Sequence, residues 1–163
     1  MKDLTTYYMK EALKQAKKAY NAGETPIGAV IVKDNKIIAR AYNKRETKKC
    51  VTYHAEILAI EKACKALGGW RLPECDLYVT MEPCPMCAGA IVQSRIDNVY
   101  FGAYDYKYGC CGSKTNLFEP GLFYYNVNCI GGILEEECKE LIQSFFKELR
   151  NNKKKLRSEY NEI

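Results

Sequence analysis

The spacing of apolar residues at the start of the chain predicts a helix followed by a β-hairpin. Asp3 is placed to cap the helix, and apolar side chains recur on one helical face at Leu4, Tyr8, Ala12, Ala16 and Ala19. Two runs rich in β-branched residues, 28–33 and 36–42, flank the turn dipeptide Asp34-Asn35. Segment 44–52 is polar and charged, so we expect a loop there.

The middle of the chain predicts alternating helices and strands. Gly68-Gly69 is expected to end one helix, and Pro83 is well placed to begin the next, because proline is favoured in a first helical turn. The long, aromatic-rich stretch 104–126 is expected to be irregular. The expected elements are a helix over 54–67, a strand over 76–81, a short helix over 83–92, and strands over 98–103 and 127–131. Strands that alternate with helices indicate an α/β layer.

The last helix has the clearest period in the chain, with apolar residues at Leu134, Cys138, Leu141, Ile142, Phe145 and Leu149. Glu135–Glu137 open this helix, while Lys147 and Arg150 close it, which matches the helix dipole. We divide the chain into one globular domain, residues 1–151, and a basic C-terminal tail, residues 152–163.

Composition favours a globular protein with a polyanionic partner. The chain has a mass of 18.6 kDa and is 47% hydrophobic and 28% charged, which fits a single domain. No apolar run is long enough to span a bilayer and the first residues lack a signal-peptide core, so we expect a cytoplasmic protein. The net charge is +5, and basic residues gather near the end, although such a tail is often only a solvated terminus.

The nine cysteines are expected to be free thiols and metal ligands. Their number is odd and no secretion signal precedes them, so a disulfide framework is not expected. Cys84 and Cys87 are three positions apart, so on a helix they face the same way. A lone C-x-x-C pair is also found in redox pairs and in halves of structural zinc sites. The other cysteines offer no second C-x-x-C.

His54, the only histidine of the chain, can supply a third ligand. Two thiolates, one imidazole and an open position make a catalytic zinc site, where zinc lowers the pKa of water to about 7. Because the first residue of a helix is not yet helical, His54 can turn to the metal while Glu56 reaches the water as an acid–base group. Taken one at a time, each residue has an ordinary interpretation. His54 would be a structural histidine, Glu56 a partner of the helix dipole, and Cys84 and Cys87 packing residues. In combination, H-A-E followed thirty positions later by P-C-P-M-C is much more specific.

This combination is the signature of the zinc-dependent nucleobase deaminases. The likeness continues through ETPIGAV at 24–30, Asn43, LYVTMEPCPMCAGAI at 77–91, SRI at 94–96, FGAYDYKYG at 101–109, GS at 112–113, GILEEEC at 132–138 and FFK at 145–147. The chain thus resembles the bacterial tRNA-specific adenosine deaminases of the TadA type, which belong to the cytidine/deoxycytidylate deaminase superfamily.

The resemblance implies a three-layer α-β-α cytidine-deaminase-like fold with a central mixed five-stranded sheet over residues 1–151, and usually a homodimer. It implies conversion of adenosine to inosine at the wobble position of a tRNA anticodon. His54, Cys84 and Cys87 would bind one Zn²⁺, and Glu56 would activate the water and protonate the purine and the departing amine. The implied substrate contacts are Ile27, Asn43, Ala55, Pro83, Asp105, Phe146 and the basic tail.

The chain departs from this family at two places near the expected substrate. Tyr53 stands where the family usually has a small residue, and Tyr124-Tyr125 stands where Asn-His is common. One alternative is therefore a deaminase of a free nucleobase or nucleoside, of guanine or cytosine type, with the same zinc site. Another is a catalytically silent RNA-binding or zinc-scaffold protein, against which the intact Glu56 argues.

Overall fold

The structure is a computed structural model that describes residues 3–161. Its elements are α1 (Leu4–Asn21), β1 (Gly28–Lys33), β2 (Lys36–Tyr42), α2 (Arg45–Lys48), α3 (Ala55–Leu67), β3 (Cys75–Met81), α4 (Pro85–Gln93), β4 (Asn98–Ala103), β5 (Asn128–Ile130) and α5 (Glu135–Asn161). Among the described residues, no helix combines the length and the apolar character needed to cross a bilayer.

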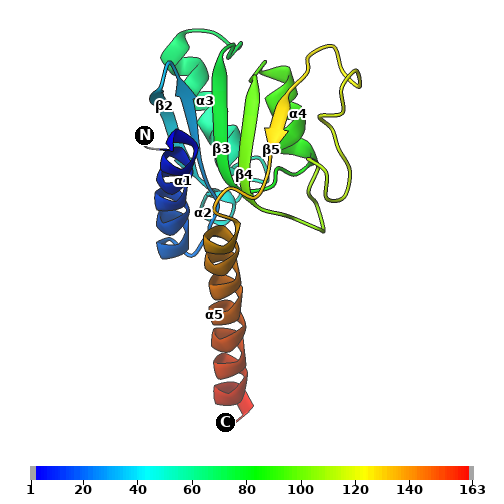
Figure 1. The fold of residues 1–163 in the computed structure, drawn as a ribbon. Helices are drawn as coiled ribbons and strands as arrows, with labels where there is room; N and C mark the ends of the chain where they lie inside the picture. Colours follow the sequence, from blue (N-terminus) through cyan, green and yellow to red (C-terminus); the bar gives the residue numbers. More distant parts are fainter. Residues whose placement is uncertain (1–2, 162–163) are drawn as a thin grey trace.

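The five strands form one mixed sheet in the order β2-β1-β3-β4-β5. β1 is antiparallel to both β2 and β3, whereas β3, β4 and β5 are parallel. One core lies between the sheet and α3 and α4, and a second lies on the opposite face under α1 and α5 (Figure 1). The expected three-layer α-β-α fold is confirmed.

Local sequence accounts for the first helix and the hairpin. The carboxylate of Asp3 accepts a hydrogen bond from the Thr5 N–H and caps α1. The apolar face of α1 is buried as expected from Tyr8 onwards, but Leu4 is exposed. Asp34 and Asn35 have φ values of 50° and 58°, the left-handed conformation that a two-residue hairpin turn requires. Aspartate and asparagine tolerate that conformation better than most residues.

Gly28 is needed where α1 crosses β1. A Cβ at this position would overlap the carbonyl oxygen of Ala12 and the amide nitrogen of Ala16 on α1. Because both obstacles are backbone, they cannot move without shifting the helix. We expect Gly28→Ala to lower the free energy of unfolding by about 3 kcal/mol, measured by urea denaturation. Gly89→Ala is the control, because a Cβ there meets open space inside α4, and it should raise stability by about 0.5–1 kcal/mol. Equal effects of the two changes would contradict this account.

Two helices differ from the sequence expectation. The short helix begins at Pro85 rather than Pro83, with Cys84 as its N-cap. The last helix does not close at Arg150 but continues to Asn161, so residues 152–161 of the expected tail are helical and residues 162–163 lie outside the described range. This segment lacks glycine and proline and is rich in lysine, so it can extend a helix that is already nucleated by packing.

The two expected loops have different outcomes. Segment 44–52, expected to be a loop, contains the short helix α2. The stretch 104–126 is irregular as expected, apart from an isolated bridge between Cys111 and Asn116. The strand expected at 127–131 is shorter and covers Asn128–Ile130.

Candidate active site

Two helix starts meet at the predicted metal site. His54 is the N-cap of α3 and Cys84 is the N-cap of α4, and both have extended backbone conformations. Within residues 3–161, neither side chain makes the usual capping hydrogen bond to its own helix. Instead, the Sγ of Cys84 lies 3.7 Å from the Nδ1 of His54, and the Sγ of Cys87 lies 3.6 Å from the same nitrogen. The local geometry that we inferred for His54 is therefore present.

These three ligand atoms fit a zinc ion. They all lie within 4.8 Å of one another. Around tetrahedral zinc, with Zn–S near 2.3 Å and Zn–N near 2.0–2.1 Å, a sulfur and a nitrogen ligand are separated by about 3.6 Å. The two sulfur–nitrogen distances agree with that value. Both helix N-termini also point at the cluster, which favours thiolates there.

The cluster favours one thiolate even without a metal. A hydrogen bond from Cys87 lowers the pKa of the Cys84 thiol to about 4. The same bond raises the pKa of Cys87, and burial adds to this effect. A hydrogen bond to Cys84 raises the pKa of His54, while burial opposes it. A cysteine thiolate next to an imidazole is a donor set that zinc prefers.

Glu56 is a buried carboxylate in an unusual position. Its side chain is 4% exposed, and its Oε2 has no hydrogen-bond partner among the described residues. Burial raises the pKa of Glu56 to about 7. Buried polar atoms are nearly always paired, so an unpaired carboxylate oxygen beside a metal-binding cluster indicates a ligand or a reacting group. Glu56 thus has the chemistry of a general acid–base residue.

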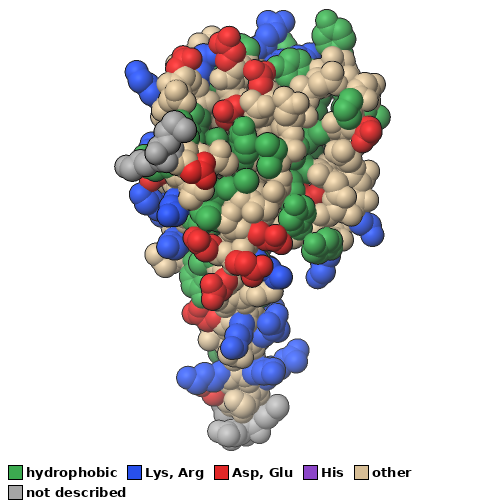
Figure 2. All heavy atoms as spheres, in the orientation of Figure 1, with side chains coloured by type: hydrophobic (Ala, Val, Ile, Leu, Met, Phe, Trp, Pro, Cys, Tyr) green, Lys and Arg blue, Asp and Glu red, His purple; other side chains and the backbone are tan. Residues whose placement is uncertain are grey.

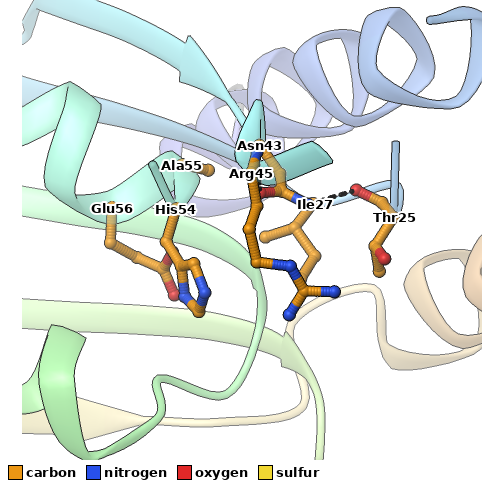
Figure 3. Close-up of a pocket in the computed structure, with 7 residues that line it drawn as sticks. All are labelled: Thr25, Ile27, Asn43, Arg45, His54, Ala55 and Glu56. Carbon is orange, nitrogen blue, oxygen red and sulfur yellow. Dashed lines mark hydrogen bonds between the residues drawn. The ribbon is translucent and has the colours of Figure 1, made fainter. Parts of the chain in front are cut away.

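A cavity of about 60 Å³ opens beside this cluster (Figure 3). Its lining residues are Thr25, Ile27, Asn43, Arg45, His54, Ala55 and Glu56. Three of the expected substrate contacts, Ile27, Asn43 and Ala55, therefore line one pocket together with Glu56. The side-chain amide of Asn43 donates to the carbonyl of Thr25 at 3.4 Å, and its Oδ1 accepts from the Arg45 N–H at 3.2 Å.

The other expected contacts lie outside this cavity. Pro83 is buried beside Cys84 but is not among the described residues that line the pocket, and its carbonyl accepts the Cys110 N–H. The Oδ1 of Asp105 accepts hydrogen bonds from Lys107 and Tyr108 in its own turn. Phe146 is 40% exposed on α5 and packs edge-to-face on Phe145.

Two buried carboxylates, Glu24 and Glu82, hold α2 and the loop after β4, and the sequence reasoning missed both. Glu24 accepts hydrogen bonds from Glu46 and Thr47 at the start of α2. Glu82 accepts from the backbone N–H groups of Asp105, Cys111 and Ser113, and so holds the loop after β4. Both residues lie inside motifs that carry the family resemblance, which was the available signal. Thr25 and Arg45, which line the pocket, were also missed.

The known proteins that this chain resembles are deaminases. Residues 4–150 match the family model described as MafB19-like deaminase. A tRNA-specific adenosine deaminase of Bacillus subtilis (strain 168) is 54% identical over 155 residues, which cover 95% of this chain and 96% of the relative. The chain belongs to the tRNA-specific adenosine deaminase family. The family resemblance inferred from the sequence is thereby confirmed.

Solved structures of deaminases share this fold. One comes from a study of A-to-I editing by tRNA:A34 deaminases at the wobble position of transfer RNA. It is 43% identical, has a TM-score of 0.78, and is matched over 83% of this chain and 99% of its own. A guanine deaminase from Bacillus subtilis is 47% identical with a TM-score of 0.58, over 60% of this chain and 63% of its own. This chain therefore shares part of its framework with a guanine deaminase.

The tyrosines that depart from the family pattern are not among the described residues that line the pocket. Tyr53 is half-buried and directly precedes His54, which does line it. The hydroxyl of Tyr125 donates to the Asp97 carboxylate, and the Arg95 guanidinium lies 5.4 Å from the centre of its ring. Tyr124 is 96% exposed. Tyr125 is therefore held by packing against its neighbours, whereas Tyr124 is open to a partner.

Proposed function

We propose that this protein is a zinc-dependent hydrolytic deaminase that converts adenosine to inosine at the wobble position of a tRNA anticodon. The observation that carries the deaminase chemistry is the unpaired carboxylate of Glu56 beside the His54, Cys84 and Cys87 cluster. The substrate is supported by relatives that are named tRNA-specific adenosine deaminases and match nearly the whole chain.

The reaction consumes one water and releases one ammonia. His54 through Nδ1, Cys84 and Cys87 would hold one Zn²⁺. When bound, zinc supplies a water that is acidic enough to attack carbon at neutral pH. Glu56 carries one proton from the attacking water to a ring nitrogen of the purine, and a second to the amine that leaves as ammonia. Its place in the first turn of α3 keeps the carboxylate beside the cluster.

The pocket residues would hold the flipped base. Ala55 is the first residue of α3, so its backbone N–H has no partner within the helix and can donate to the purine. Ile27 supplies an apolar wall and Asn43 a polar group in the same lining. We assign Pro83 to the turn that carries Cys84. Asp105 and Phe146 would contact RNA outside the cavity, Asp105 from the loop after β4 and Phe146 from α5.

The basic residues of α5 would hold the phosphates of the tRNA. Beyond Phe146 every described side chain of α5 up to Tyr160 is exposed, and the helix projects from the body (Figure 1). Basic side chains gather on this projecting part (Figure 2), at Lys147, Arg150, Lys153, Lys154, Lys155 and Arg157. A free base carries no phosphate, so a basic arm of this kind favours a nucleic acid over a free base as the substrate. We therefore propose residues 1–151 as the catalytic domain and residues 152–163 as an RNA-binding tail.

Changing Lys153, Lys154, Lys155 and Arg157 to glutamine should weaken binding of an anticodon stem–loop and flatten its salt dependence. Each phosphate contact contributes about 0.7–0.9 to the slope of log K against log salt, so a loss of two or more contacts is readily measured. The control changes the four exposed lysines of α1, at positions 10, 14, 17 and 18, to glutamine, which alters the net charge equally. Binding titrations at several salt concentrations test the assignment. Identical slopes for both variants would contradict a specific role for α5.

A second candidate is a deaminase of a free nucleobase, because a guanine deaminase shares part of the framework at 47% identity. The same cluster and Glu56 would then act on guanine. Salt-sensitive affinity for the stem–loop separates the two functions, since guanine needs no phosphate contact. A silent RNA-binding or zinc-scaffold protein has no use for the buried carboxylate of Glu56.

Assembly and location follow from the proposed substrate and the family. The homodimer implied by the resemblance stays a prediction, which sedimentation analysis of the purified protein can test. We propose a cytoplasmic enzyme, because tRNA would be its substrate and all nine cysteines, which lie between Cys50 and Cys138, are free thiols suited to a reducing compartment.

A further inference from the structure

We propose that Arg45 binds a phosphate of the RNA chain next to the target adenosine, and so makes the pocket select a nucleotide within RNA over a free base. This assignment rests on the proposed function. It assigns substrate selection to a residue of the pocket itself, whereas the basic residues of α5 lie outside the pocket.

Arg45 is the cationic residue among the described residues that line the cavity. The side chains of Glu56, His54 and Arg45 extend to the same side of the site (Figure 3). A base that enters beside His54 and Glu56 brings its own sugar and the two flanking phosphates to the rim of the pocket. The guanidinium is therefore on the path of the backbone that follows the flipped base.

The backbone of Arg45 is held in place from two sides. Its N–H donates to the Oδ1 of Asn43 at 3.2 Å. The next two N–H groups, of Glu46 and Thr47, donate to the fully buried carboxylate of Glu24 at 3.2 and 2.6 Å. Glu24 thus caps α2 from a distant part of the chain. Asn43, which we propose holds the base, also lines the pocket. The hydrogen bond between Asn43 and Arg45 therefore fixes these two residues relative to each other.

The guanidinium is available for an anion. Its side chain is 46% exposed, and within residues 3–161 its ion pair is with Glu46, at 3.3 Å. Glu46 is 70% exposed, and a pair of this kind contributes little to stability. Arginine presents a planar fork of N–H groups that matches two phosphate oxygens. A free nucleobase offers no anion, so this feature favours a nucleotide substrate.

The test combines a protein change with a substrate change. Arg45→Gln is compared with Lys48→Gln, an exposed cation on the same four-residue helix that does not line the cavity among the described residues. Each variant is assayed for inosine in three anticodon stem–loops: one unmodified, one with a neutral methylphosphonate on the 5′ side of the wobble adenosine, and one with it on the 3′ side. Circular dichroism and melting temperature verify that each variant is folded.

We expect Arg45→Gln to raise KM for the unmodified stem–loop about tenfold with kcat within about twofold, as for a lost charge-assisted hydrogen bond. Lys48→Gln should change KM by less than about twofold. In the unchanged protein, one of the two methylphosphonates should raise KM by a similar factor. In Arg45→Gln the same methylphosphonate should not raise KM further, because the guanidinium that would bind this phosphate is already absent. An unchanged KM in Arg45→Gln would overturn the assignment. So would a result in which each methylphosphonate raises KM by the same factor in Arg45→Gln as in the unchanged protein. If the unchanged protein forms no inosine in the unmodified loop, the proposed function fails, and this assignment fails with it.

Discussion

Glu56→Gln is expected to abolish deamination while leaving zinc bound. The amide keeps the size of the side chain but cannot take a proton from water, and general acid–base catalysis contributes about 10²–10⁴-fold to such reactions. The proposed metal ligands His54, Cys84 and Cys87 are untouched. The melting temperature should not fall, because the change removes a buried carboxylate whose Oε2 has no partner among the described residues.

The measurement is the initial rate of inosine formation together with zinc content by atomic absorption. Glu61→Gln is the matched control, because Glu61 is an exposed carboxylate on the same helix, α3. It should retain activity within about twofold, as is usual for surface substitutions away from a site. Full activity in Glu56→Gln would show that another group moves the protons.

Cys87→Ser is expected to remove zinc, activity and part of the stability. Cys87 is fully buried, and its Sγ is one of the three proposed ligand atoms, so the two that remain cannot complete the site. A metal that binds only the folded state adds about 4 kcal/mol when it is present at a thousand times its Kd. Losing that contribution should lower the melting temperature by about 8–16 °C for a chain of this size.

Cys50→Ser provides the comparison for a thiol outside the cluster. Cys50 is half-buried just before His54, and its Sγ contacts the hydroxyl of Thr52 rather than the metal ligands. It should keep one zinc per chain and the melting temperature of the unchanged protein. If Cys87→Ser also retained one zinc per chain, the ligand set proposed here would be wrong.

The sequence predicted those helices and strands whose ends are fixed by residues close by in the chain, such as turn residues and glycines. The hairpin of β1 and β2 matches the expected residues because Asp34-Asn35 fixes its turn. The helix α3 ends at Gly68 because that residue adopts the left-handed conformation. The extent of α5 was not predicted, since the apolar period describes only the part of a helix that packs on the sheet.

The helix α2 shows why part of the site was hidden from sequence. Its four residues give no periodic signal, and two of its N–H groups are satisfied by Glu24, some twenty positions earlier in the chain. The position of Arg45 therefore depends on this distant cap and on the hydrogen bond from its own N–H to Asn43. His54, Glu56, Cys84 and Cys87 were recognised from sequence because zinc chemistry fixes both residue type and spacing. Whether a departure such as Tyr125 packs or contacts substrate depends on its partners in space, here Asp97 and Arg95.

The central claim is tested most directly by one assay of substrate choice. Zinc-loaded protein is incubated with an anticodon stem–loop that carries adenosine at the wobble position, and in parallel with free guanine, adenosine and cytidine. Inosine is measured by mass spectrometry of the digested RNA, and ammonia is measured in every reaction. We predict inosine in the stem–loop and no ammonia from the three small molecules. Ammonia from guanine or from a nucleoside, with no inosine in the RNA, would contradict the account and assign the same catalytic site to a small substrate.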